Sequence, residues 1–155
     1  MGEMIKVNFN NYKIEKIKKM EQDMKDKYGY YVHYVIPEKE GELIDCHTHG
    51  LMETFGHKEI QIKTTVSQKS ACSFINSIVD IIRGLEIEKS ILDLDVEIAP
   101  KGFVPIKYKE LKDEFGEELI RLIIPDRNGK YPWDEDCEES YKKQWTMEDE
   151  LNAKN

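Results

Sequence analysis

The segment "YYVHYVIPEKEGELIDCHTHG", residues 30–50, decides the fold that the sequence predicts. Its first part, residues 30–36, is rich in β-branched and aromatic side chains, which is typical of a strand. A turn follows at residues 37–41, with a proline at its start and a glycine at its end. The chain then returns as a second strand over residues 42–48. Strands joined by so short a turn pair antiparallel, so the segment predicts a hairpin.

The segments on either side of this hairpin alternate between helix and strand patterns. Before it, apolar residues recur with helical spacing over residues 11–28, and Gly29 provides a stop. After it, residues 58–66 alternate between apolar and polar side chains, which predicts a strand with one buried face. A second helix is expected from Ser67 or Ser70 to Gly84, and its apolar stripe predicts deeper burial than that of the first helix.

The second half of the chain adds further strands. Residues 93–100 and 102–108 read as strands, and Pro105 places the latter at an edge of the sheet. Residues 118–125 form the strongest strand pattern, and a short helix is expected near the C-terminus.

These elements predict an α+β fold with a single domain. We expect a mainly antiparallel sheet with the helix around Phe74 buried on one face. An amphipathic N-terminal helix would occupy residues 1–29, the core domain residues 30–144, and an acidic frayed tail residues 145–155.

Composition narrows the classes of function. The net charge is −8, and residues 134–150 alone contribute −6, which disfavours nucleic-acid binding because that requires a basic surface. No apolar run approaches the ~20 residues of a membrane span, and the first residues lack a signal-peptide core. Three scattered cysteines suit free thiols in a reducing compartment, so we expect a cytoplasmic protein without membrane contact.

The histidines are the strongest chemical signal. All four, His33, His47, His49 and His57, fall between residues 33 and 57. His47 and His49 share one face of a strand, and the hairpin brings His33 near His47, although a slip of one residue would move it to the other face. Converging imidazoles are ligands for zinc or another divalent transition metal, so these four residues are candidate metal ligands.

Other roles for these histidines stay open. They could donate hydrogen bonds in a structural role, or one could act as a catalytic acid or base. Glu53 and Glu59 are the candidate general bases beside them. A barrel-type metallohydrolase is excluded, because it needs about 250 residues and the chain has no histidine after His57 to supply further ligands.

The loop "PDRNGKYPW", residues 125–133, is the second local signal. The loop has residues typical of a tight turn, namely Asp126, Asn128 and Gly129. The side chain of Trp133 adds a large apolar surface. The oxygen donors of this segment also allow a binding loop, but they do not follow the order of a calcium-binding EF-hand.

Three phrases together resemble the bacterial domain of unknown function 4262. They are "THGL" at residues 48–51, "FGHKEIQI" at residues 55–62 and "PDRNGKYPW" at residues 125–133, and the likeness covers roughly residues 30–144. The resemblance implies a small bacterial cytoplasmic protein and no particular activity. It also implies that His57 and Glu59 belong to the family pattern. Many members carry other residues in place of His47 and His49, so these two are either unimportant or the special chemistry of a subgroup.

The sequence therefore favours a binding or accessory module that self-associates. One alternative is a small metal-dependent hydrolase that uses His47, His49 and His57. Another is an immunity or anti-defence protein that contacts a protein partner through its acidic C-terminal region.

Overall fold

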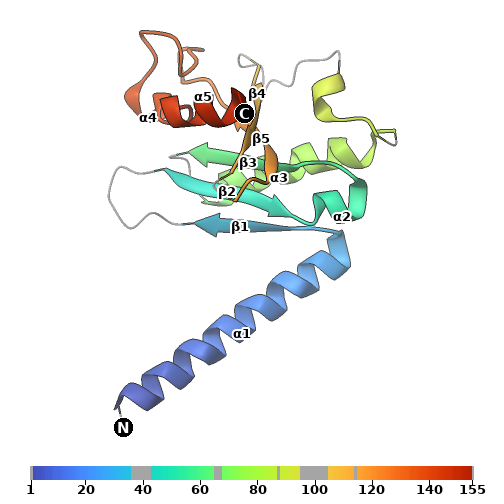
Figure 1. Ribbon diagram of the computed structural model, residues 1–155, viewed down its shortest axis with the longest axis vertical. Coiled ribbons are helices and arrows are strands. Elements are labelled where there is room, and N and C mark those ends of the chain that lie inside the picture. Colours follow the sequence, from blue (N-terminus) through green and yellow to red (C-terminus); the bar gives the residue numbers. More distant parts are fainter. Residues whose placement is uncertain are drawn as a thin grey trace.

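The computed structural model describes residues 2–35, 43–64, 68–86, 88–94, 105–113 and 115–154. Its strands form a five-stranded sheet in the order β1–β2–β3–β5–β4 (Figure 1). The strands are β1 (Tyr31–Val35), β2 (Ile44–His49), β3 (Glu59–Thr64), β4 (Lys107–Lys112) and β5 (Glu118–Ile123). The helices are α1 (Gly2–Tyr28), α2 (Leu51–Phe55), α3 (Gln68–Arg83), the 3₁₀ helix η1 (Ile91–Asp93), α4 (Glu139–Lys142) and α5 (Met147–Lys154). The prediction of a single α+β domain with a mainly antiparallel sheet is confirmed.

The predicted hairpin is present. β1 and β2 pair antiparallel, with His33 directly opposite His47 and Tyr31 opposite His49. The turn predicted at residues 37–41 lies outside the described residues. β2 also pairs antiparallel with β3, and β5 pairs antiparallel with β4. The β3–β5 pair is parallel, a feature the sequence did not reveal, and α3 lies in the connection between them, as a parallel crossover requires.

One face of the sheet forms the hydrophobic core. α3 packs on it against β2 and β3, as predicted from the apolar stripe around Phe74. The fully buried residues here include Cys46, Ile60, Ile62, Ile75, Ile78, Val79, Ile120 and Leu122. Since side chains alternate along a strand, the residues between these ones point to the opposite face, which is polar.

Three elements differ in position or type from the sequence predictions. β4 covers Lys107–Lys112 rather than residues 102–108, so Pro105 lies before the edge strand instead of inside it. Of the strand expected at residues 93–100, the described part forms the end of η1, and residues 95–104 lie outside the description. The short helix α2 was not predicted, because five residues are too few to show a helical period.

α1 extends diagonally away from the sheet (Figure 1) and begins at Gly2, ahead of residue 11, where the apolar spacing of the predicted helix starts. Apolar side chains on it are largely exposed: Ile14, Ile17, Met20, Met24 and Tyr28. At the other end of the sheet, α5 packs against β4. None of the helices in the described parts of the chain has the length and apolar character of a membrane span.

Candidate functional site

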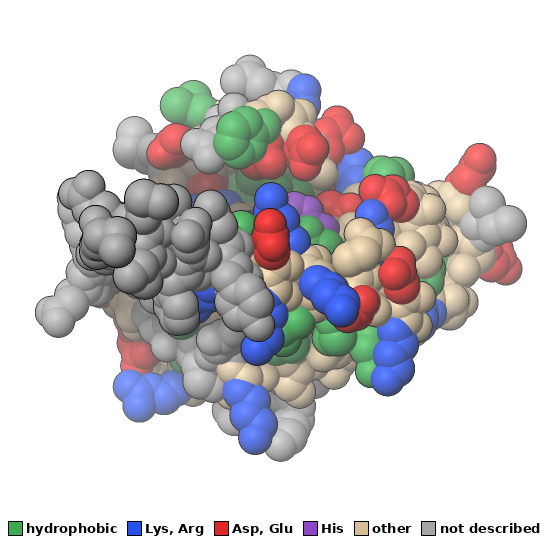
Figure 2. Space-filling model, turned by 90° about the horizontal axis from the view of Figure 1, so that it is seen from below, with side chains coloured by type: hydrophobic (Ala, Val, Ile, Leu, Met, Phe, Trp, Pro, Cys, Tyr) green, Lys and Arg blue, Asp and Glu red, His purple; other side chains and the backbone are tan. Residues whose placement is uncertain are grey.

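The polar face of the sheet carries a row of directly opposed residues, one from each strand. In strand order they are His33, His47, Gln61, Arg121 and Lys109. The row runs across the whole sheet, from the edge strand β1 to the edge strand β4. When the molecule is seen from below, histidine side chains are visible between basic and acidic ones (Figure 2).

Three imidazole rings gather at the β1–β2 end of the row. The ring centroid of His47 lies 5.2 Å from that of His33 and 4.8 Å from that of His49. The rings of His33 and His49 are 5.8 Å apart. Nε2 of His47 lies 3.1 Å from Nε2 of His49, so these two ring nitrogens are within hydrogen-bond distance of each other.

Asp45 holds the other nitrogen of the His47 ring. Its Oδ1 lies 3.1 Å from Nδ1 of His47 and accepts a hydrogen bond of 3.0 Å from Nε2 of Gln61. Burial acts to raise the pKa of Asp45, but the hydrogen bonds from His47 and Gln61 outweigh it and hold the pKa below its usual value. Asp45 is therefore a carboxylate at neutral pH and can only accept.

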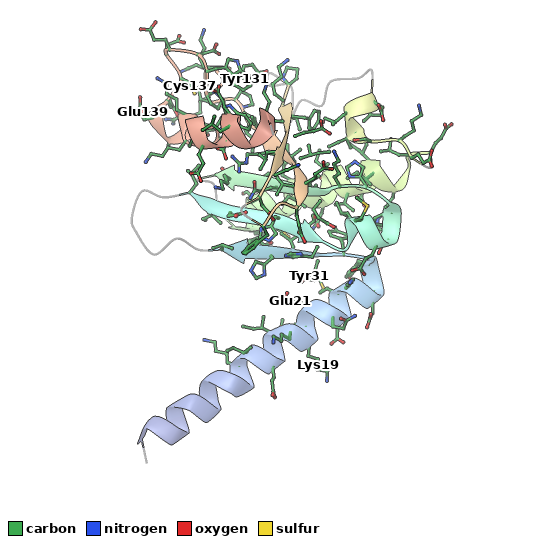
Figure 3. All side chains as sticks on the ribbon, viewed as in Figure 1. Lys19, Glu21, Tyr31, Tyr131, Cys137 and Glu139 are labelled. Atoms are coloured by element: carbon green, nitrogen blue, oxygen red, sulfur yellow. The ribbon has the colours of Figure 1, made fainter. Side chains whose placement is uncertain are left out.

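Glu21 and Tyr31 border the cluster where α1 meets the sheet (Figure 3). The Glu21 carboxylate lies 3.9 Å from Nδ1 of His33, which is longer than a hydrogen bond. The Tyr31 ring packs on His49 with a centroid distance of 5.1 Å. Burial and a hydrogen bond to Glu21 raise the pKa of Tyr31, which keeps its hydroxyl neutral.

The surroundings of His49 favour its neutral form. Burial lowers the pKa of His49 below the ordinary value, and the neighbouring His47 lowers it further. A neutral imidazole has a lone pair, which is the form that binds metal ions. In the described residues, no three His, Cys, Asp or Glu side chains already converge as a complete set of metal ligands.

A protein-family model matches residues 25–138, which is most of the chain. Its description is "Domain of unknown function (DUF4262)". The chain belongs to the DUF4262 family. Neither the curated proteins nor the solved structures contain a match to it.

Two of the segments through which the sequence resembles DUF4262 form one hydrogen-bonded unit around α2. The Glu59 carboxylate accepts bonds from the Thr48 hydroxyl and from the backbone N–H groups of Leu51 and Met52, at 2.9–3.2 Å. The Thr48 hydroxyl in turn accepts a bond from the N–H of Ile60. Gly50 and Gly56 flank α2 with positive φ. These residues anchor α2 to the sheet.

The two glutamates considered as general bases are thus engaged elsewhere. Both oxygens of Glu59 accept bonds at the start of α2. Glu53 forms an ion pair of 2.6 Å with Lys25, and 71% of its side chain is exposed.

His57 does not join the other three histidines. It is buried, its Nδ1 donates to the Lys58 carbonyl at 2.7 Å, and its Nε2 accepts from the N–H of Ile91 at 3.3 Å. Both ring nitrogens are therefore occupied, and the bond from Ile91 joins the segment before β3 to η1. Burial lowers the pKa of His57, in agreement with a neutral ring that donates at one nitrogen and accepts at the other.

The DUF4262 loop at residues 125–133 is organised by Asp126. This buried carboxylate accepts bonds from the N–H groups of Asn128, Lys130 and Glu138. Burial acts to raise the pKa of Asp126, but these donors together hold it below its usual value. Gly129 has a φ of +78°, which suits the predicted turn.

Trp133 is half exposed beside this turn. Its ring stacks on Tyr131 with centroids 5.3 Å apart, and Nζ of Lys109 lies 5.4 Å from its centre. The candidate binding loop is thus placed over β4, at the opposite end of the polar row from the histidines.

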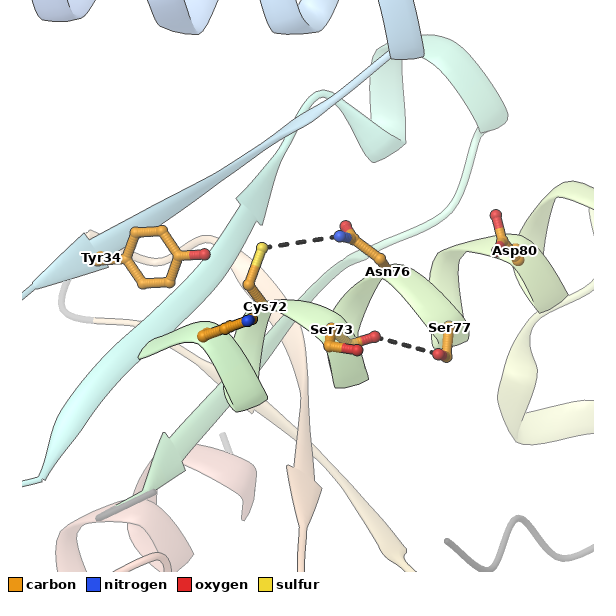
Figure 4. Close-up of a pocket in the computed structure, with 7 residues that line it drawn as sticks. Tyr34, Cys72, Ser73, Asn76, Ser77 and Asp80 are labelled. Carbon is orange, nitrogen blue, oxygen red and sulfur yellow. Dashed lines mark hydrogen bonds between the residues drawn. The ribbon is translucent and has the colours of Figure 1, made fainter. Parts of the chain in front are cut away.

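A shallow hollow lies on the other side of the sheet, between β1 and α3 (Figure 4). Its lining consists of Tyr34, Lys69, Cys72, Ser73, Asn76, Ser77 and Asp80. Asn76 donates to the Cys72 sulfur at 3.6 Å. Nearby, burial raises the pKa of the Cys46 thiol to about 12, so this thiol is part of the core and not a nucleophile.

Sequence reasoning missed Gln61, Arg121 and Asp149 as parts of the site. Arg121 is buried in the middle of the strongest strand and forms an ion pair of 2.6 Å with Asp149. A charged residue within an apolar strand pattern is the signal that could have revealed it, since a buried charge needs a partner.

Proposed function

We propose that this DUF4262 domain is a binding module for a divalent transition metal ion such as zinc. The ligands would be His47 and His49, with His33 completing the set. The observation that carries the proposal is the 3.1 Å separation between Nε2 of His47 and Nε2 of His49. Two nitrogens bound to one tetrahedral zinc ion, each at about 2.0–2.1 Å, lie about 3.3 Å apart, so this pair needs little movement to bind.

His33 would provide the third nitrogen after a rotation of its ring. Its side chain is 43% exposed, and its contact with Glu21, at 3.9 Å, is too long to fix it. It lies directly opposite His47, so turning the ring is enough to bring a nitrogen toward the other two. The site would then hold three histidines and leave a fourth position for water or a ligand.

Binding is favoured over hydrolysis because the candidate bases are used for other purposes. Glu59 anchors α2 and Glu53 is paired with Lys25. In a metal-dependent hydrolase, a free base beside the metal ion assists in activating water. Asp45 is also committed, since it accepts from His47 and Gln61.

Titration of chelator-treated, untagged protein with zinc tests the proposal, followed by metal analysis after gel filtration. We expect close to one zinc ion per chain, a Kd in the micromolar range or tighter, and no binding of Mg²⁺, which prefers oxygen ligands. The double variant His47→Gln/His49→Gln should lose at least about 100-fold in affinity, as expected for removal of two ligands.

Lys109→Met is the matched control, because Lys109 lies on the edge strand β4, at the opposite end of the polar row from the histidines. Its affinity should equal that of the wild type. Zinc-free wild-type protein under these conditions, or a double variant that binds as well as the wild type, contradicts the proposal.

A cytoplasmic location, self-association and a protein partner stay predictions. Self-association is tested first by substituting the exposed apolar side chains of α1. Binding of a protein partner is tested first by substituting acidic side chains of residues 134–150.

A further inference from the structure

The row of polar residues does more than bring histidines together. Beyond His47 it continues through Gln61 and Arg121, and hydrogen bonds link these residues in order. The direction of each bond follows from which groups can donate and which can accept.

Arg121 is the first residue in this series of hydrogen bonds, which we call the positioning series, and it can only donate. Its side chain is 2% exposed, it forms an ion pair with Asp149 of α5 at 2.6 Å, and it donates to the Gln144 carbonyl at 3.1 Å. Its Nε donates to Oε1 of Gln61 at 2.9 Å. A guanidinium has no acceptor, so the Gln61 oxygen must face Arg121 and the Gln61 amide nitrogen must face the other way.

The orientation of the Gln61 amide determines which group faces Asp45. Its amide nitrogen donates to Oδ1 of Asp45 at 3.0 Å, and the same oxygen lies 3.1 Å from Nδ1 of His47. Since a carboxylate oxygen can only accept, Nδ1 of His47 must carry the hydrogen. In the neutral ring, Nε2 of His47 then carries the lone pair, and it lies 3.1 Å from Nε2 of His49.

We propose that Asp45, Gln61 and Arg121 are positioning residues that hold His47 in the Nδ1–H tautomer and so keep its Nε2 ready to bind a ligand. In the metal-free protein, Nε2 of His49 then donates to Nε2 of His47 across 3.1 Å. His47 is the preset ligand, and His49 has to move its hydrogen from Nε2 to Nδ1 before it can bind. The relevance for metal affinity rests on the proposed function, whereas the tautomer assignment does not.

The same series makes α5 a part of the site. Arg121 is fixed from α5 by Asp149 and from the preceding residues by the Gln144 carbonyl. Partners that orient a ligating histidine are typically worth about 10- to 100-fold in metal affinity. A substitution in α5 can therefore alter the orientation of His47 and the metal affinity without any direct contact with the histidines.

The tautomer of His47 can be read in the full-length, metal-free protein from long-range ¹H–¹⁵N NMR spectra of the histidine rings. We expect protonated Nδ1 and bare Nε2 for His47, and the reverse for His49. In Asp45→Asn, the Gln61 amide still holds an oxygen toward His47, so its tautomer should be unchanged. In Asp45→Asn/Gln61→Met this constraint is gone, and His47 should show exchanging tautomers and, in zinc titrations, an affinity about 10-fold weaker.

Lys109→Met is the matched control, because Lys109 is the next residue of the row beyond Arg121 but does not take part in the series. It should leave the tautomer of His47 as in the wild type. A wild-type His47 with hydrogen on Nε2, or a switch of tautomer in Asp45→Asn alone, overturns the inference. Expected tautomers without zinc binding would instead reject the proposed function and leave the positioning series standing.

Discussion

His33 of β1 and His47 of β2 lie directly opposite each other, with their ring centroids 5.2 Å apart. His49, two residues along β2, adds a third ring on the same face. Burial, together with repulsion from His47 and His33, lowers the pKa of His49 in the folded protein. Protonation of His49 should therefore oppose folding.

The first prediction is that the free energy of unfolding decreases as the pH falls below about 6.5. Burial lowers the pKa values of His49 and His57 in the folded state below the ordinary 6.5, so the unfolded chain binds more protons between those values and 6.5. Stability is complete above this window and is lost on acidification through it. Urea unfolding at pH 7.5, 6.5 and 5.5 measures the effect.

The variant His49→Gln isolates the contribution of one ring. Its stability should depend less on pH between 7.5 and 5.5 than that of the wild type, because one of the groups with a lowered pKa is gone. Parallel curves for the two proteins would contradict this explanation.

The hairpin was predictable from sequence because each of its parts carries a local signal. β-branched strands flank a Pro–Gly turn, and the two-residue period puts His47 and His49 on one face. Whether His33 faces them depends on the register, which one residue in the turn can change. The sequence left this open, and the structure pairs His33 with His47.

The environment of His57 and the parallel β3–β5 pair could not be predicted. His57 accepts a hydrogen bond from Ile91, 34 residues further along the chain. The parallel pairing of β3 with β5 depends on the connection between them, which includes α3. Such contacts depend on the tertiary arrangement, and no local pattern encodes them. The same holds for the positioning series, which joins residues from β2, β3, β5 and α5.

The second prediction compares two glycines that flank α2. In Gly50→Ala, the new Cβ would lie 2.8 Å from the Gly29 carbonyl oxygen at a φ of +104°, so we expect a loss of about 3 kcal/mol or more in unfolding free energy. In Gly56→Ala, the φ of +67° is strained but nothing lies within 4 Å, so the loss should be about 1 kcal/mol. Chemical denaturation measures both, and equal losses would contradict the close approach at Gly50.

The third prediction concerns the buried ion pair between Arg121 and Asp149. Arg121→Met leaves the Asp149 carboxylate, whose side chain is only 10% exposed, without its cation. We expect a loss of about 3–5 kcal/mol in unfolding free energy. Arg121→Met/Asp149→Asn should recover part of this loss, because the uncompensated charge is then gone. A double variant less stable than Arg121→Met would show that the unpaired carboxylate is not the cause.

The last prediction distinguishes a structural from a catalytic Glu59. Its carboxylate accepts bonds from the Thr48 hydroxyl and from the first two N–H groups of α2, and an amide can offer only one oxygen to these donors. Glu59→Gln should therefore lower the unfolding free energy by about 1–3 kcal/mol and speed hydrogen exchange in α2. Glu53→Gln is the control, since its exposed ion pair with Lys25 should contribute less than about 1 kcal/mol. If Glu59→Gln leaves both stability and exchange in α2 unchanged, the carboxylate is not an anchor, and it again becomes a candidate base beside the histidines.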